Sequence, residues 1–213
     1  MVLAIIFDLD GVIVSTDEYH FLAWAKIAKQ EGIPFNHAIN HRIRGVSRME
    51  SLEIILEKAL RLYTASEKMV LAERKNSYYR ESLNQLTEQN LLPGVLTTLQ
   101  ALKKRDIKIA IGSSSKNAPI ILQKVGLIDY FDAIVDGNQI TNSKPHPEVF
   151  LLAGEKVGVS PDCCLVVEDA EAGVEAALHA GMKVASIGEA SQCGSSHFTL
   201  QTLDDLLLII DKT

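Results

Sequence analysis

Two aspartates near the start of the chain, Asp8 and Asp10, are the residues whose type and spacing most clearly suggest chemistry. They follow the apolar run Ala4–Phe7, which predicts a buried strand that ends at Asp8. Residues two apart on a strand share one face, so the carboxylates would repel each other unless a cation or a proton intervenes. Gly11 allows the backbone geometry of a loop that closes over a ligand. A plain surface turn, where Asp and Gly are also common, is the alternative interpretation.

A serine-rich segment, 113–117, follows a second apolar run, 107–112. Its hydroxyl and amide groups precede a helix that is expected to begin near Pro119, and a helix N-terminus favours anions. A simple cap and turn is the alternative, but the position after a core strand favours a binding role. The candidate residues of this segment are Ser113, Ser114, Ser115, Lys116 and Asn117.

Two more charged segments stand where strands are expected to end or a helix to begin. Lys144 lies between turn-forming residues ahead of the helical stretch 148–157, and Glu168 and Asp169 follow the apolar run 165–167. A loop lysine is usually solvated, and acidic residues also favour helix starts. Together with the first pair, however, the acidic residues make four carboxylates, which form a plausible oxygen site for Mg²⁺. The lysine would serve as a fixed counter-charge.

The elements that must position these residues divide into a helical insert and an alternation of strands and helices. From about Asp17 to Asn90, apolar residues recur at helical spacing. The expected strands beyond this insert lie at 107–112, 133–135, 165–167 and 183–187, and helical stretches separate them. This pattern predicts an α/β fold with a Rossmann-like parallel-sheet core, residues 1–15 and 93–213, and an inserted all-helical domain, residues 16–92. An open parallel sheet binds ligands beyond the carboxyl ends of its strands.

The composition and net charge of the chain argue against some classes of binding partner. The 213 residues are 47% hydrophobic and carry a formal net charge of −6, which argues against nucleic acid or an anionic membrane surface as the main partner. Three cysteines, Cys163, Cys164 and Cys193, suit a reduced protein better than a disulfide scaffold. Neither a signal peptide nor a membrane span is evident, so we expect a cytoplasmic protein.

The motifs, taken in order, resemble those of the haloacid dehalogenase superfamily of phosphotransferases. They are Asp8–Val12, Ser113, Ser143–Pro145 and Glu168–Asp169. The helical insert resembles the cap domain of that superfamily. A narrower resemblance, to the β-phosphoglucomutase family, spans nearly the whole chain and rests on Glu18–Phe21, Trp24, Arg44–Arg48, Arg74–Asn76 and Ser115–Asn117.

The resemblance implies a reaction that interconverts β-D-glucose 1-phosphate and glucose 6-phosphate through an aspartyl-phosphate and β-glucose 1,6-bisphosphate. It makes Asp8 the nucleophile and Asp10 the general acid and base. Lys144 and Ser113 would hold the transferring phosphoryl oxygens. Mg²⁺ would be bound by Asp8, by the backbone carbonyl of Asp10, and by Asp169 with Glu168 nearby.

The resemblance also implies a second phosphate site, because the bisphosphate must be held by its other phosphate. Arg48 of the cap and Ser115, Lys116 and Asn117 of the core would form this distal site. His20 with Lys75 would couple sugar binding to acid-base catalysis, although a lone helical histidine is also a common surface residue. The remaining substrate-binding candidates are Thr16, Trp24, Gly45, Val46, Ser47, Ser51 and Ser114.

Two other functions stay open at this point. A cap-bearing phosphatase would use the same core residues and let water attack the phosphoenzyme, and the distal phosphate residues favour the mutase over it. A non-catalytic phosphosugar-binding protein would leave the aspartate pair unexplained. We expect a monomer. The sequence departs from the family pattern at Ser15, Arg44, Ser114 and His146, and the sugar preference is the property most exposed to these changes.

Overall fold

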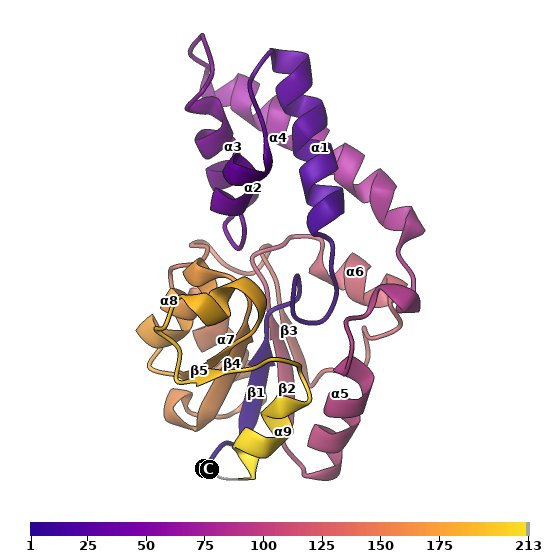
Figure 1. The fold of residues 1–213 in the computed structure, drawn as a ribbon, viewed down its shortest axis with the longest axis vertical. Helices are drawn as coiled ribbons and strands as arrows, with labels where there is room; N and C mark the ends of the chain where they lie inside the picture. Colours follow the sequence, from indigo (N-terminus) through magenta and orange to yellow (C-terminus); the bar gives the residue numbers. More distant parts are fainter. Residues whose placement is uncertain (212–213) are drawn as a thin grey trace.

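The computed structural model describes residues 1–211, which form one parallel six-stranded sheet with helices on both faces and a helical insert. Its strands are β1 (Ala4–Phe7), β2 (Lys108–Gly112), β3 (Ala133–Val135), β4 (Cys164–Glu168), β5 (Lys183–Ser186) and β6 (Phe198–Thr199). They lie in the order β3-β2-β1-β4-β5-β6, and every neighbouring pair is parallel (Figure 1). The fold class predicted from the sequence is confirmed.

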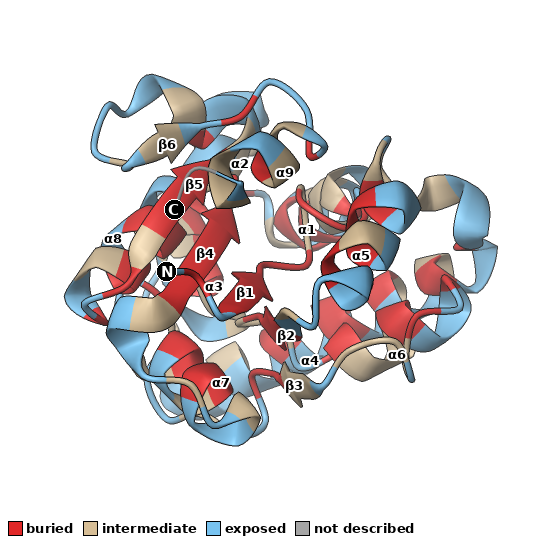
Figure 2. Ribbon diagram, turned by 90° about the horizontal axis from the view of Figure 1, so that it is seen from below, coloured by how far each residue is buried: buried red, intermediate tan, exposed pale blue. Residues whose placement is uncertain are grey.

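Side chains of the central strand β1 alternate between two hydrophobic cores. Ile5 and Phe7 pack with the helices of one face of the sheet, and Ala4 and Ile6 pack with those of the other. Because both faces are covered, β1 is apolar along its whole length, and Figure 2 shows β1 and β4 as buried. The helices of the first face are α5 (Val95–Lys104), α6 (Ala118–Lys124) and α9 (Asp205–Ile210), and those of the second are α7 (Glu148–Val157) and α8 (Glu171–His179).

The parallel arrangement brings the polar strand ends to one edge of the sheet. Asp8 follows the central strand β1, Ser113 follows β2, and Glu168 is the last residue of β4. β1 pairs with both β2 and β4, so these three strand ends are neighbours in space. The topology therefore collects the predicted chemistry at the carboxyl edge.

The helical insert has its own hydrophobic core, separate from those of the sheet. Trp24, Ile27, Leu52, Ile55 and Leu71 are buried together in it. Figure 1 shows the insert beyond one end of the sheet. Its helices are α1 (Asp17–Glu31), α2 (His37–Arg42), α3 (Arg48–Leu56) and α4 (Ala65–Ser82), followed by the 3₁₀ helices η1 (Leu83–Gln85) and η2 (Glu88–Asn90).

Local signals explain where the insert helices begin and end. Gly32 ends α1 in the left-handed conformation, with φ of 67°, which glycine adopts at little cost. Ser47 and Glu50 form a capping box that starts α3, and Thr64 and Glu67 do the same for α4. Both helix starts are therefore encoded within four residues of sequence.

The two chain segments that join the insert to the sheet lie side by side. Val14 and Leu91 form an antiparallel bridge, and the Leu92 amide donates to the Ile13 carbonyl at 3.0 Å. The insert thus leaves and re-enters the sheet layer at a single place. The proposed domain limits at residues 16 and 92 stay a prediction.

The observed strands differ from the predicted ones mainly at their ends. The strand predicted at 107–112 begins at Lys108, because the Ile107 amide bonds the Leu102 carbonyl of α5 instead of joining the sheet. The strand predicted at 165–167 extends by one residue at each end, and the one predicted at 183–187 ends at Ser186. Strand β6 was not predicted, because two residues are too short for a periodic pattern. Two further 3₁₀ helices are η3 (Pro161–Cys163) and η4 (Gly188–Gln192).

Helix α4 is long but strongly charged, with Glu67, Lys68, Glu73, Arg74 and Lys75 among its 18 residues. Across the described range 1–211, no helix has both the length and the apolar character that crossing a membrane requires.

A substitution of Phe150 in α7 would test the packing of the hydrophobic core between the sheet and helices α7 and α8. Its ring is fully buried, and a Cβ on Gly112 of β2 would come within 2.8 Å of it. We expect Phe150→Ala to lower the free energy of unfolding by about 3–5 kcal/mol, because it removes buried area and leaves a cavity. Urea denaturation would measure this. Leu151→Ala, at an exposed position of the same helix, should change it by less than about 1 kcal/mol. Equal losses in the two variants would contradict this packing.

Candidate active site

A cavity of about 1120 Å³ lies between the carboxyl edge of the sheet and the helical insert. Most of the predicted site residues line it. The core contributes Asp8, Asp10, Ser113, Ser114, Ser115, Lys116, Asn117 and Asp169, and the insert contributes His20, Trp24, Gly45, Val46, Ser47, Arg48, Ser51 and Lys75. Three other predicted residues, Thr16, Lys144 and Glu168, are buried just behind this lining.

A buried lysine ties together two of the acidic strand ends. Lys144 donates through Nζ to Asp8 Oδ1 and to Glu168 Oε1, and its side chain is 1% exposed. Burial alone would lower the pKa of Lys144, but the two carboxylates outweigh it and raise that pKa above its ordinary value. Burial raises the pKa of Asp8 to about 7, against the attraction of Lys144. Lys144 is thus a permanent positive charge at the base of the cavity.

Glu168 has both carboxylate oxygens engaged by the protein. Oε1 accepts from Lys144, and Oε2 accepts from the backbone amides of Asp169 at 2.9 Å and Ala170 at 3.0 Å. Gly173 leaves room for this carboxylate, since a Cβ there would lie 1.9 Å from Oε1. These bonds fix the turn that carries Asp169.

Three carboxylates form a cluster whose donors suit a divalent cation. One oxygen each of Asp8, Glu168 and Asp169 lies within 4.8 Å of the others. Burial and the neighbouring carboxylates of Glu168 and Asp8 raise the pKa of Asp169. Hard oxygen ligands in this arrangement fit a small, doubly charged ion, which would also relieve the repulsion. Gly11 has φ of +83°, and a Cβ there would lie 2.0 Å from Asp169 Oδ2, so the loop requires glycine.

Asp10 lies outside that cluster and faces the insert. Thr16 donates a hydrogen bond to Asp10 Oδ1 and lies 3.0 Å from the hydroxyl of Tyr79 on α4. Burial raises the pKa of Asp10 to about 6, while the Thr16 hydroxyl opposes this shift. Asp10 is therefore close to half-protonated at mildly acidic pH and able to give or take a proton.

His20 and Lys75 contact each other on the insert side of the cavity. Lys75 Nζ lies 2.7 Å from His20 Nδ1 and 5.0 Å from the centre of the Trp24 ring. Burial, followed by repulsion from Arg48, lowers the pKa of Lys75 to about 7. Burial and the nearby cations also lower the pKa of His20, so its ring is neutral. The pair lines the cavity beside Asp10.

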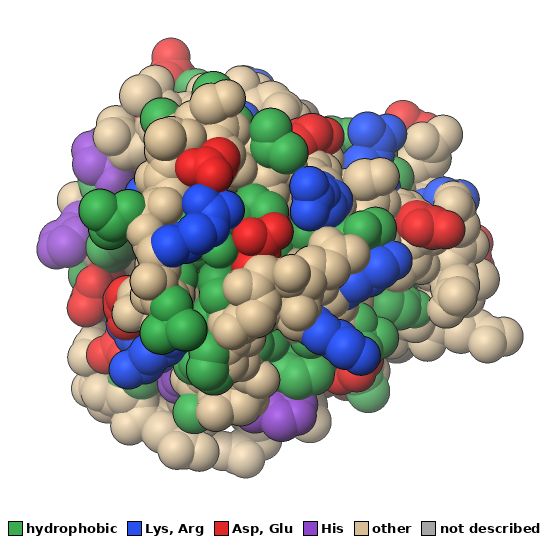
Figure 3. All heavy atoms as spheres, turned by 90° about the horizontal axis from the view of Figure 1, so that it is seen from above, with side chains coloured by type: hydrophobic (Ala, Val, Ile, Leu, Met, Phe, Trp, Pro, Cys, Tyr) green, Lys and Arg blue, Asp and Glu red, His purple; other side chains and the backbone are tan. Residues whose placement is uncertain are grey.

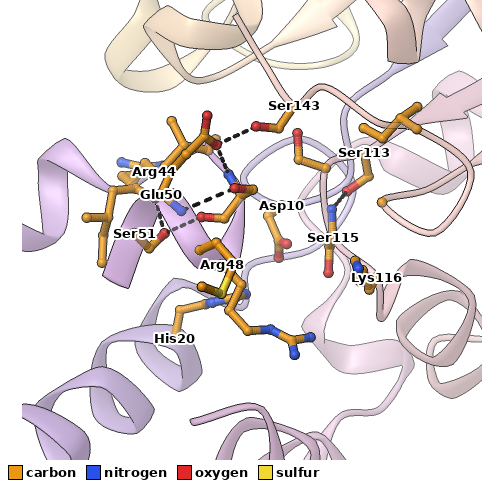
Figure 4. A pocket seen from close by; sticks show the side chains of 18 of the residues that line it. Asp10, His20, Arg44, Arg48, Glu50, Ser51, Ser113, Ser115, Lys116 and Ser143 are labelled. Carbon is orange, nitrogen blue, oxygen red and sulfur yellow. Dashed lines mark hydrogen bonds between the residues drawn. The ribbon is translucent and has the colours of Figure 1, made fainter. Parts of the chain in front are cut away.

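The far end of the cavity is basic and rich in hydroxyl groups. Figure 4 shows Arg48 on the insert side of this space and Ser115 and Lys116 on the core side. The Ser115 amide donates to Ser113 Oγ at 3.2 Å, which joins the far end to the strand end. Among residues 1–211, Ser114 Oγ is a buried side-chain atom without a hydrogen-bond partner. These groups can receive an anion within the cavity that Asp8 also lines.

Several direct contacts hold the insert against the core. Asn117 Nδ2 donates to Asn76 Oδ1 at 3.0 Å, and Ser143 donates to Glu50. Arg44 of the insert donates to Asp169 and pairs with Glu189 of the core at 2.7 Å. Residues of the insert and of the core that line the cavity are consequently joined by direct contacts.

Most of the chain matches a known family of proteins. The sequence profile of the haloacid dehalogenase-like hydrolases covers residues 5–187. The chain belongs to this family. The β-phosphoglucomutase of Bacillus subtilis (strain 168) is 46% identical over 207 residues, which cover 96% of this chain and 92% of that protein. A phosphorylated carbohydrates phosphatase of Thermotoga maritima is 36% identical and covers 84% of this chain and 82% of its own length.

A solved structure supports the same relationship within the haloacid dehalogenase-like family. The β-phosphoglucomutase of Clostridium difficile superposes with a TM-score of 0.94 at 38% identity, over 100% of this chain and 96% of that one. These similarities confirm the haloacid dehalogenase superfamily and the β-phosphoglucomutase family, both recognised from the motifs.

Some residues that line the cavity or contact its lining are not singled out by the sequence. Glu73 and Glu189 are exposed acids that look like ordinary surface charge. Glu50 carries a capping-box pattern, which explains its place in α3 but not its contact with Ser143. Tyr79 follows the helical apolar spacing of α4 and reads as a core residue. Only the three-dimensional arrangement of insert and core reveals these contacts.

The acidic cluster predicts that a divalent cation stabilises the protein. A cation at about 100 times its dissociation constant adds about 2.7 kcal/mol to the free energy of unfolding. We expect the midpoint of thermal unfolding to rise by about 5–10 °C in magnesium chloride. Asp169→Asn should abolish the rise, whereas Asp162→Asn, at a carboxylate outside the cluster, should retain it. A full rise in Asp169→Asn would place the cation elsewhere.

The low pKa of Lys75 predicts that the stability of the folded protein depends on pH. Its pKa is about 7 in the folded protein against an ordinary 10.5, so the unfolded chain binds more protons between these values. Stability should therefore rise with pH across this range, by up to about 1.4 kcal/mol per pH unit from this residue. Urea denaturation at several pH values should give a shallower slope for Lys75→Met than for the wild type. Lys29→Met, at an exposed position of α1, is the control, and matching slopes in all three proteins would refute the low pKa.

Proposed function

We propose that this protein is a β-phosphoglucomutase, an isomerase that interconverts β-D-glucose 1-phosphate and glucose 6-phosphate. The observation that carries the proposal is the presence of two anion-receiving ends in one cavity. Asp8 and Lys144 stand at one end, and Arg48 and the Ser115–Asn117 segment stand at the other. Such a cavity would hold a bisphosphate by one phosphate at each end. The relatives named β-phosphoglucomutase support the same assignment.

In the first half of the reaction, the phosphoryl group moves between the sugar and the enzyme. A carboxylate oxygen of Asp8 bonds phosphorus as the bond from phosphorus to the sugar oxygen breaks. Asp10 donates a proton to the departing sugar oxygen and takes one back from the hydroxyl that attacks in the reverse direction. Lys144, buried beside Asp8, and Ser113 stabilise the charge on the transferring oxygens.

Mg²⁺ is the cofactor proposed for the acidic cluster. Asp8, Asp169 and the backbone carbonyl of Asp10 would hold it, and Glu168, whose oxygens are bonded within the protein, would fix the position of Asp169. When bound, the ion neutralises the clustered carboxylates and the phosphoryl oxygens. The oxygen-only donor set is the feature that supports this choice.

Between the two half-reactions, the bisphosphate would leave its first position in the cavity and turn round. Arg48, with Ser115, Lys116 and Asn117, would hold whichever phosphate is not at Asp8. A ligand that touches both insert and core favours the closed arrangement and keeps water from the aspartyl-phosphate. We propose residues 16–92 as the cap domain that moves in this step, with Thr16 at its start.

The other cap residues would shape the sugar site. His20 and Lys75 lie together beside Asp10 and would bind sugar hydroxyl groups near the proton transfer. Trp24 offers an apolar face, and Gly45, Val46, Ser47 and Ser51 form one continuous wall with the start of α3. Ser114 offers a buried hydroxyl that needs a partner. We also propose that the protein is a monomeric, cytoplasmic enzyme that acts on small phosphosugars.

A phosphatase of the same superfamily is the second candidate, supported by the Thermotoga maritima relative. Its chemistry would differ only in the group that accepts the phosphoryl from Asp8. A protein that binds phosphosugars without catalysis is the third. Figure 3, which looks onto the end that carries the insert, shows basic side chains scattered among acidic and apolar ones, as suits a small ligand that enters a cavity.

One reaction separates these functions. Purified protein is mixed with Mg²⁺, β-glucose 1-phosphate and a trace of glucose 1,6-bisphosphate, and glucose 6-phosphate and free phosphate are followed together. We expect glucose 6-phosphate to dominate, because the closed cap excludes water. Dominant free phosphate would establish the phosphatase instead. The absence of both products would refute the assignment of β-glucose 1-phosphate as the substrate, and a panel of other phosphosugars would then be tested.

Two substitutions test the roles proposed for the two ends of the cavity. Asp8→Asn should reduce turnover by at least about 10³-fold, because the nucleophile is lost. Arg48→Ala should raise KM by about 10- to 100-fold through the loss of charge-assisted hydrogen bonds to phosphate. Arg61→Ala, at an exposed arginine elsewhere in the cap, should behave as the wild type. An active Asp8→Asn variant would contradict the proposed chemistry.

A further inference from the structure

Arg48 has a carboxylate partner at the far end of the cavity. Arg48 Nη1 of α3 lies 3.3 Å from Glu73 Oε2 of α4, and both residues line the cavity. The second oxygen of the same carboxylate, Glu73 Oε1, accepts from Asn76 Nδ2 at 3.3 Å. Asn76 in turn accepts from Asn117 of the core through Oδ1. One acidic side chain therefore touches two insert residues that face the distal phosphate segment.

The two partners of this ion pair differ in their freedom to move. The Arg48 side chain is 22% exposed, whereas that of Glu73 is 72% exposed. An exposed carboxylate exchanges readily with water, and ion pairs of this kind contribute little to stability. Glu73 can thus swing away while Arg48 remains in the cavity.

The charges around Arg48 explain why a carboxylate belongs there. Burial lowers the pKa of Arg48, Glu73 opposes this shift, and Arg80 adds to it. Arg48 also repels Lys75, which lowers the pKa of that lysine. Glu73 is the counter-charge for these cations when the cavity holds no phosphate. A phosphate group would compete with it, because both are anions that accept hydrogen bonds from one guanidinium.

We propose that Glu73 is a positioning residue that pairs with Arg48 until a phosphate displaces it. The proposal rests on the proposed function, since it requires Arg48 to receive the distal phosphate. A negative charge at this rim weakens the hold on the phosphate and lets the bisphosphate leave Arg48 and turn round. Tight binding at this end would instead trap the intermediate.

Glu73→Gln is the variant that isolates the charge. Glutamine keeps a carbonyl oxygen for Asn76 Nδ2, so the contact between Asn76 and Asn117 is retained. Glu81→Gln makes the same charge change at another exposed position of α4 and is the matched control. Arg48→Ala, alone and combined with Glu73→Gln, completes a double-mutant cycle.

The experiment is calorimetric titration of each protein with glucose 6-phosphate at low and high sodium chloride. We expect Glu73→Gln to bind about two- to fivefold more tightly than the wild type at low salt, because a competing anion is gone. The gain should shrink at high salt and vanish when Arg48 is alanine. Glu81→Gln should bind as the wild type. In the mutase assay, Glu73→Gln should lower KM and kcat together, because phosphate release becomes slower.

The outcomes separate this proposal from the function on which it rests. Loss of binding in Arg48→Ala together with unchanged or weaker binding in Glu73→Gln would overturn the role of Glu73 alone. Wild-type binding in Arg48→Ala would overturn both the distal phosphate site and the role of Glu73. A gain in Glu73→Gln that persists without Arg48 would also overturn the proposal, since the charge would then act on another group.

Discussion

The structure of the site depends on one buried charge, the ammonium group of Lys144. Three carboxylates at the ends of β1 and β4 would be costly to bury together, and Lys144 bonds two of them at once. This bond connects the segment after β3 to the centre of the sheet. It therefore fixes the geometry of Asp8 and, through Glu168, of the turn that carries Asp169.

The sheet side of this arrangement could be predicted from sequence because each part has a local signal. Apolar runs mark the strands, polar residues follow them, and parallel topology brings the strand ends together. Asp8, Ser113 and Asp169 are predicted in this way, whereas Lys144 is predicted from its place between turn-forming residues ahead of a helix, as a counter-charge to the acidic pairs. Strand ends were less well predicted, as at Ile107, where a helix carbonyl competes with the sheet for the backbone amide.

The contacts between the insert and the core could not be predicted in the same way. They join residues far apart in the chain, such as Arg44 with Asp169 and Asn76 with Asn117, and no short pattern encodes them. Glu73 carries no sequence signal of function, because an acid on an exposed helix face is ordinary. Local motifs thus predict the residues of the sheet layer. The contacts that join the insert to the core, and the place of Glu73 beside Arg48, depend instead on how the helices and the sheet pack together.

The junction at Val14 and Leu91 has an evolutionary consequence. The insert has a hydrophobic core of its own, and its chain is joined to that of the sheet layer through one bridged pair of segments. A different sequence of another length can occupy the span between these two residues without altering any strand pairing of the sheet. The insert can therefore be exchanged as a module, while the acidic cluster and Lys144 of the sheet layer keep their arrangement.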